Sequence, residues 1–162
     1  VSLVDALLHR KGWAVTASYV PAQVVGCIAG AILANLMFAE PAVAWSTTDR
    51  ATGPHLVAEV VATAGLVLVI FALVRTGRPQ LAAPAVGAYI GAAYFFTSST
   101  SFANPAITIG RAFSDTFAGI APASVLPFIA AQLIGGALGW LLVRGFFPVA
   151  EAESAASVAV RE

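Results

Sequence analysis

Charged residues are scarce in this sequence of 162 residues. Only 10% are Asp, Glu, Lys or Arg, whereas 59% are hydrophobic; an average soluble domain has roughly 25% charged residues. Basic and acidic residues balance to a formal net charge of zero, so the composition predicts no nucleic-acid partner. The chain is therefore expected to be an all-α membrane protein whose surroundings are the lipid bilayer.

Residues that bind metals or carry out catalysis are also few. Cys27 is the only cysteine, so it can form no disulfide within the chain and lacks the spaced companions of a metal site. The two histidines, His9 and His55, fall at expected membrane edges. The sequence shows no nucleophile paired with a base and no phosphate-binding loop. We therefore expect neither an enzyme nor a bound cofactor or metal.

Four apolar stretches approach the length of about 20 residues that a helix needs to cross a bilayer. They are residues 15–38, 56–74, 81–96 and 127–143, and the third is marginal in length. Basic residues flank the first, second and fourth stretches, and Lys and Arg are enriched in cytoplasmic loops. This pattern places residues 75–79 and a tail at 148–162 inside, and the loop at 39–54 outside. Trp13 and Trp45 are expected at the membrane interfaces.

The chain contains an internal repeat. The sequence Ala-Gln-Val-Val-Gly at 22–26, followed by Gly30, recurs as Ala-Gln-Leu-Ile-Gly at 131–135, followed by Gly139. Upstream of these copies, Val-Ser-Leu at 1–3 resembles Ile-Thr-Ile at 107–109. The charge pattern orients the two copies oppositely across the membrane. Inverted repeats of this kind build a path whose site lies near the midplane, where half-helices point their N-termini.

One such half-helix is predicted between the third and fourth stretches. A polar run at 97–101 leads to Asn104 and Pro105, a strong cap followed by the residue that best suits the first helical position. The half-helix is expected from Pro105 to about Phe113. Non-helical backbone at membrane depth needs water or protein around it, so residues 97–103 are expected to line a wet path with their carbonyl groups.

The sequence Phe-Ala-Asn-Pro-Ala at 102–106 resembles the second Asn-Pro-Ala signature of the aquaporin, or major intrinsic protein, family. The two Ala-Gln-x-x-Gly copies resemble the family's third and sixth helices, and Glu59 resembles the acid of its fourth helix. Residues 1–3 resemble the family's residues directly after the first Asn-Pro-Ala signature. The chain begins with Val1, not Met, so we expect that two helices and this first signature precede it.

This resemblance implies an aquaporin-like helical bundle with an inverted repeat and re-entrant half-helices, incomplete at its N-terminus. A channel domain would occupy residues 1–147 and a cytoplasmic tail residues 148–162. The resemblance further implies a homotetramer in the cell (inner) membrane that conducts water or small neutral solutes. The pore residues would be Asn104, which caps the half-helix and offers its amide to the solute, and Pro105 and Ala106, which set its shape.

The chain departs from the family pattern at the narrow outer filter. An Arg usually follows Asn-Pro-Ala directly, and here that position is Ile107. Arg111 lies one helical turn further on, where it could reach back to the filter or pair with Asp115. Ala92, near the place where water channels carry a bulky His, also favours a wider pore. Glycerol or metalloid hydroxides such as arsenite are therefore favoured over water alone. The metalloid hydroxides are suggested by a resemblance to bacterial members of the family with a displaced Arg.

Two further residues have alternative interpretations. Ser101 could line the filter or simply bond its own loop. Glu59 lies inside an expected span, where an unpaired carboxylate is costly, so it should accept hydrogen bonds from re-entrant backbone N–H groups.

The rival functions are an ion-coupled secondary transporter, which would need more intramembrane acids than Glu59, and a truncated, non-conducting fragment.

Overall fold

The computed structural model describes residues 1–8 and 12–148, and within them every regular element is a helix. The elements are α1 (Ser2–Leu7), α2 (Trp13–Met37), α3 (Gly53–Arg75), a short 3₁₀ turn η1 (Pro79–Leu81), α4 (Ala82–Phe96), α5 (Pro105–Arg111) and α6 (Pro122–Phe146). The predicted all-α class is confirmed. His9, two of the flanking basic residues and the tail from residue 149 lie outside the described residues, so the tail stays a prediction.

Three of the four expected spans are long and apolar enough to cross a membrane. These are α2, α3 and α6, with 25, 23 and 25 residues. The third expected span, α4, has only 15 residues, because the chain leaves the helical conformation at Thr97 and turns into the re-entrant segment. The sequence predicted four full spans, whereas the described part of the chain contains three helices that are long enough to span.

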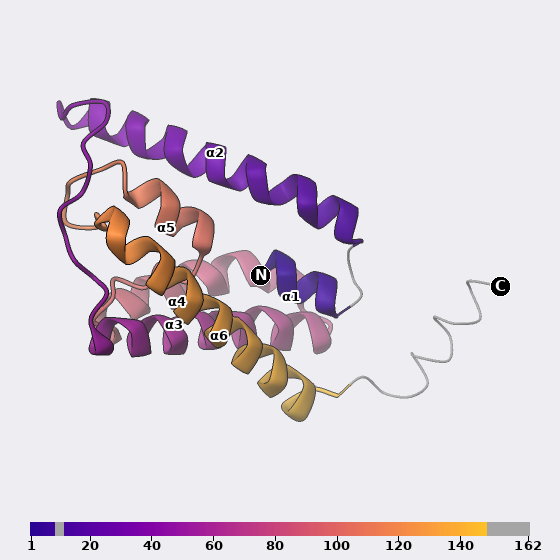
Figure 1. The fold of residues 1–162 in the computed structure, drawn as a ribbon. Coiled ribbons are helices and arrows are strands. Elements are labelled where there is room, and N and C mark those ends of the chain that lie inside the picture. Colours follow the sequence, from indigo (N-terminus) through magenta and orange to yellow (C-terminus); the bar gives the residue numbers. More distant parts are fainter. Residues whose placement is uncertain (9–11, 149–162) are drawn as a thin grey trace.

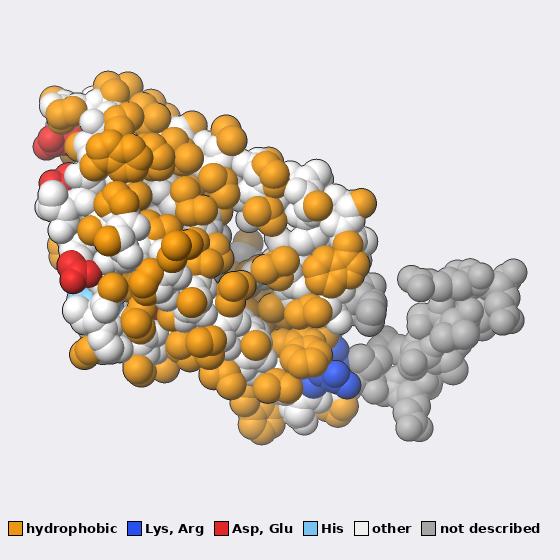
Figure 2. Space-filling view, viewed as in Figure 1, with side chains coloured by type: hydrophobic (Ala, Val, Ile, Leu, Met, Phe, Trp, Pro, Cys, Tyr) orange, Lys and Arg blue, Asp and Glu red, His pale blue; other side chains and the backbone are white. Residues whose placement is uncertain are grey.

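The helices form two layers of packing around the short α5 (Figure 1). Helix α6 crosses α3, and α5 lies between α2 and this pair. Figure 2 shows apolar side chains spread over the visible face, with charged side chains confined to the two ends of the bundle. Trp13 and Trp45 are each 58% exposed, as expected of side chains that anchor a helix bundle at the membrane surface.

Small residues allow α6 to lie directly on α3. A Cβ atom on Gly139 would stand 2.7 Å from the Val67 Cβ and 2.8 Å from the Ala64 carbonyl oxygen. One helical turn earlier, a Cβ on Gly135 would meet the Val60 carbonyl oxygen at 2.5 Å. Close approach of this kind replaces the hydrophobic effect as the source of helix association in lipid.

We expect Gly139→Ala to lower the free energy of unfolding by about 1–3 kcal/mol, the usual cost of overpacking a closed contact. The matched control is Gly145→Ala on the same helix, where a Cβ would meet nothing within 4 Å. Unfolding of both variants in mixed micelles by increasing amounts of a denaturing detergent measures the difference. Equal stability of the two variants would contradict the close contact.

Candidate functional site: the re-entrant segment and its half-helix

The segment between α4 and α5 turns back into the bundle through strained backbone. Thr100, Ser101 and Ala103 have φ values of 63°, 52° and 47°, in the left-handed region that costs a residue with a Cβ roughly 1–2 kcal/mol. Such a conformation persists only where the surroundings fix it. The segment must therefore be held by strong contacts from the helices around it.

The Glu59 carboxylate supplies these contacts. It is 0% exposed, and its Oε1 accepts hydrogen bonds from the Ser99 Oγ at 2.7 Å and the Phe102 N–H at 2.9 Å. Its Oε2 accepts from the Ala103 N–H at 2.9 Å and the Gln132 Nε2 at 2.7 Å. The hydrogen bonds that the sequence predicted from re-entrant N–H groups to Glu59 are present, and they join α3, the segment and α6.

Most of the segment is buried, which differs from the expectation that residues 97–103 line a wet path. Ser99, Ser101 and Phe102 are 0%, 3% and 4% exposed, because the Glu59 carboxylate on α3 accepts hydrogen bonds from the Ser99 hydroxyl and the Phe102 N–H, on either side of Ser101. Three cavities described below lie around α5, and of residues 97–103 only Ala103 lines one of them. The Ser101 Oγ is buried and has no hydrogen-bond partner among the described residues, so the alternative in which it bonds its own loop is not seen, and a place in the filter stays a prediction.

Asn104 begins α5 as its cap. Its Oδ1 accepts a hydrogen bond from the Ala106 N–H at 2.9 Å, and Pro105 occupies the first helical turn. The amide N–H₂ of Asn104 has no partner in the described part of the chain. Helix α5 ends at Arg111, two residues before the predicted end, because the N–H groups of Ala112 and Phe113 bond back only three residues.

A cavity of about 210 Å³ lies where the N-terminal ends of α1 and α5 meet. Residues 1–3 line it from α1, residues 104–106 from α5, and Gln23 from α2. The first positions of both short helices thus open on the same space, and the free amide of Asn104 is available to a molecule within it.

The internal repeat is visible in the side-chain contacts. Gln132 on α6 donates to the Thr108 Oγ1 at 2.8 Å, and Gln23 on α2 donates to the Ser2 Oγ at 3.4 Å. Each repeat therefore joins its long helix to its short helix through a glutamine amide and a side-chain hydroxyl group. The second copy also contacts a carboxylate, Glu59.

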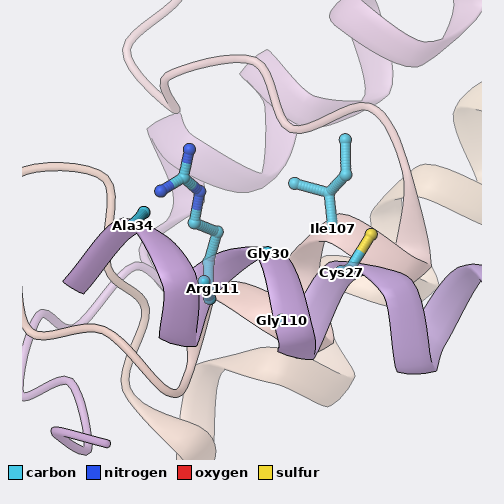
Figure 3. Close-up of a pocket in the computed structure, with 7 residues that line it drawn as sticks. Cys27, Gly30, Ala34, Ile107, Gly110 and Arg111 are labelled. Carbon is cyan, nitrogen blue, oxygen red and sulfur yellow. The ribbon is translucent and has the colours of Figure 1, made fainter. Parts of the chain in front are cut away.

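Ile107 and Arg111 line a second cavity of about 220 Å³ between α5 and α2. Figure 3 shows their side chains on the same side of α5, with Cys27, Gly30 and Ala34 of α2 beside them. Arg111 and Ala34 also line a third cavity, of about 300 Å³, with Glu40 at its edge.

The described residues show no ion pair between Arg111 and Asp115. The Asp115 carboxylate instead accepts hydrogen bonds from the Thr47 N–H at 3.0 Å and its Oγ1 at 3.4 Å. The pairing alternative for Arg111 is thus not realised, and its guanidinium faces the cavities. Ala92 is exposed on α4 and lines none of these three cavities.

The sequence pointed to no role for Arg50, which the structure buries. This side chain is 5% exposed and donates to the carbonyl oxygens of Gly119 at 2.7 Å and Phe117 at 2.8 Å. The only signal in the sequence was that Arg50 is the single basic residue of a long polar loop. That pattern does not distinguish a buried arginine from a solvated one.

Comparison with known proteins decides the family. The chain is 47% identical over 148 residues to the Aquaglyceroporin AqpS of Rhizobium meliloti (strain 1021). The match covers 89% of this chain and 61% of that protein, so the chain spans less than two thirds of its relative's length.

The chain belongs to the aquaporin family. This family contains channels and not enzymes, and its members cross the membrane several times, in agreement with the three spanning helices α2, α3 and α6. No family model matches the chain, and no solved structure matches it either. The relationship therefore rests on the similarity to this aquaglyceroporin sequence, and the predicted residues at 103–106 line the cavity at the start of α5.

We expect Glu59→Gln to destabilise the protein by about 3–5 kcal/mol, as when one partner of a buried charged network is removed. An amide offers one acceptor oxygen and turns an N–H₂ donor towards the remaining donors. The exposed Glu40 gives the control, Glu40→Gln. Resistance of the purified proteins to a denaturing detergent measures both effects, and a Glu59→Gln protein as resistant as the Glu40→Gln protein would contradict this role.

Proposed function

We propose that the complete protein is a passive channel for water and small neutral hydroxyl-bearing solutes, with glycerol as the main substrate class. The observation that carries this proposal is the free amide of Asn104, which stands at the N-terminus of α5 in a cavity shared with α1. A donor in this position can bond the oxygen of a passing solute. The positive end of the α5 dipole opposes the entry of cations there.

The outer filter supports a wide pore. Ile107 occupies the position after Asn-Pro-Ala and lines the cavity between α5 and α2 with Arg111. A branched apolar side chain offers no donor and cannot narrow the path as a guanidinium does. The pore we propose therefore admits glycerol and neutral metalloid hydroxides such as arsenite, and Asn104, Pro105, Ala106, Ile107 and Arg111 are its proposed lining.

The pore needs a partner helix on α2. Gly135 and Gly139 are pressed against α3, whereas the equivalent Gly26 and Gly30 of the first repeat have nothing within 4 Å of a built Cβ. Among the described residues, Gln23 likewise contacts no carboxylate, whereas Gln132 contacts Glu59. By the symmetry of the repeat, a helix carrying an acid is expected to lie along Gly26 and Gly30 in the complete channel, which we propose to be a homotetramer in the cell (inner) membrane.

The contacts of Glu59 weigh against coupling to an ion gradient. Its two oxygens accept four hydrogen bonds and are shielded from solvent. A coupling site must release and rebind its ion, and this carboxylate has no free oxygen with which to do so. Passive flow is therefore the function we propose for the path beside it.

Asn104→Asp is expected to reduce the glycerol permeability of vesicles carrying the intact protein by about tenfold or more. The carboxylate removes the amide donor and places a charge in the solute path, where charge is costly. Rates of vesicle swelling in a glycerol gradient measure the effect. The control is Gln80→Glu, the same change of amide to acid at an exposed position. Unchanged swelling in Asn104→Asp would remove the channel proposal.

Ile107→Arg is expected to lower glycerol permeability several-fold while water permeability is retained. The guanidinium would narrow the outer filter and supply donors that hold water molecules. Stopped-flow shrinkage in sucrose reports water, and swelling in glycerol reports the larger solute. Parallel changes in the two permeabilities would show that residue 107 does not set the size of the pore.

A further inference from the structure

Arg50 approaches the re-entrant segment from the loop between α2 and α3. Besides the carbonyl groups of Phe117 and Gly119, its Nη1 donates to the Ser99 carbonyl oxygen at 3.4 Å. Its guanidinium carbon lies 5.4 Å from the centre of the Phe102 ring. The side chain therefore contacts the segment that enters the half-helix as well as the loop that follows it.

Arg50 and Glu59 act on the same two residues through different atoms. Glu59 accepts from the Ser99 hydroxyl and the Phe102 N–H, whereas Arg50 bonds the Ser99 carbonyl and stacks on the Phe102 ring. Among the described residues the two charged groups form no direct ion pair. Ser99 and Phe102 therefore lie between a buried negative charge and a buried positive charge.

The two charges also influence each other. Burial lowers the pKa of the Arg50 guanidinium, and the negative charge of Glu59 opposes this change. An arginine side chain stays protonated in proteins even when buried. The positive charge beside the segment is thus permanent.

A lone carboxylate in this position would favour cations in the adjacent path. Ionised groups interact strongly across several ångströms when water is excluded, and the residue at the usual filter position, Ile107, carries no charge to offset Glu59. Arg111 is one turn further out, where it faces the outer cavities. Arg50 is the buried cation that directly contacts the residues bonded to Glu59.

We propose that Arg50 is a specificity-determining residue, whose charge compensates that of Glu59 and keeps cations out of a pore that admits neutral solutes. This inference rests on the proposed channel function. It assigns to a loop residue behind the pore wall the electrostatic role that Ile107 cannot fill.

The test compares Arg50→Gln and Arg50→Lys in vesicles that carry the intact protein. Potassium flux and glycerol flux are measured on the same vesicles, so that their ratio does not depend on the amount of folded channel. Removing one compensating charge in Arg50→Gln is expected to raise this ratio about tenfold, for an effective dielectric constant of about 20. Arg50→Lys keeps the charge and is expected to stay within about twofold of the parent protein. Arg78→Gln, which removes an exposed arginine, controls for the loss of charge alone.

An unchanged ratio in Arg50→Gln would overturn the inference, and so would an equal rise in Arg50→Gln and Arg50→Lys, since shape and not charge would then be responsible. Loss of glycerol flux in Arg50→Gln also counts against it, because the solute path must survive the loss of the charge. Absence of glycerol flux in the parent protein would instead refute the channel function itself.

Discussion

The buried carboxylate of Glu59 is the contact on which the half-helix depends. It receives donors from the re-entrant segment and from α6, while its own backbone belongs to α3. In lipid, no water is available to satisfy the N–H groups of a non-helical stretch. One ionised side chain with four lone-pair positions solves this problem at a single point, and the left-handed residues beside it can then remain in place.

Charge placed inside a membrane protein usually marks a solute or proton site. Here the arrangement differs, since Glu59 is fully occupied and Arg50 lies against the same residues. The acid acts as a scaffold, and in the proposed channel the path for solutes is left to the neutral amide of Asn104 and the apolar side chain of Ile107. Such an arrangement, with the charges in the scaffold and neutral groups along the path, suits a channel whose substrates carry no charge.

Much of this arrangement could be predicted from residues that follow local rules. Asn104 and Pro105 located the start of α5, and the need to satisfy buried backbone identified Glu59 as its brace. The loop contacts could not be predicted, because the burial of Arg50 depends on Phe117 and Gly119, which are far away in the sequence. The third stretch was predicted at 81–96 and α4 occupies 82–96, but a helix of 15 residues is shorter than the three that are long enough to span.

The dependence of the segment on Glu59 also constrains the order in which the protein forms. Two of the four donors to this carboxylate are backbone N–H groups of the segment, a third comes from α6, and α6 is synthesised after every other described helix. The four contacts can therefore be complete only after α6 has been inserted beside α3. Until α6 docks onto α3, the Glu59 carboxylate lacks its fourth donor, and the re-entrant segment is held by three hydrogen bonds instead of four.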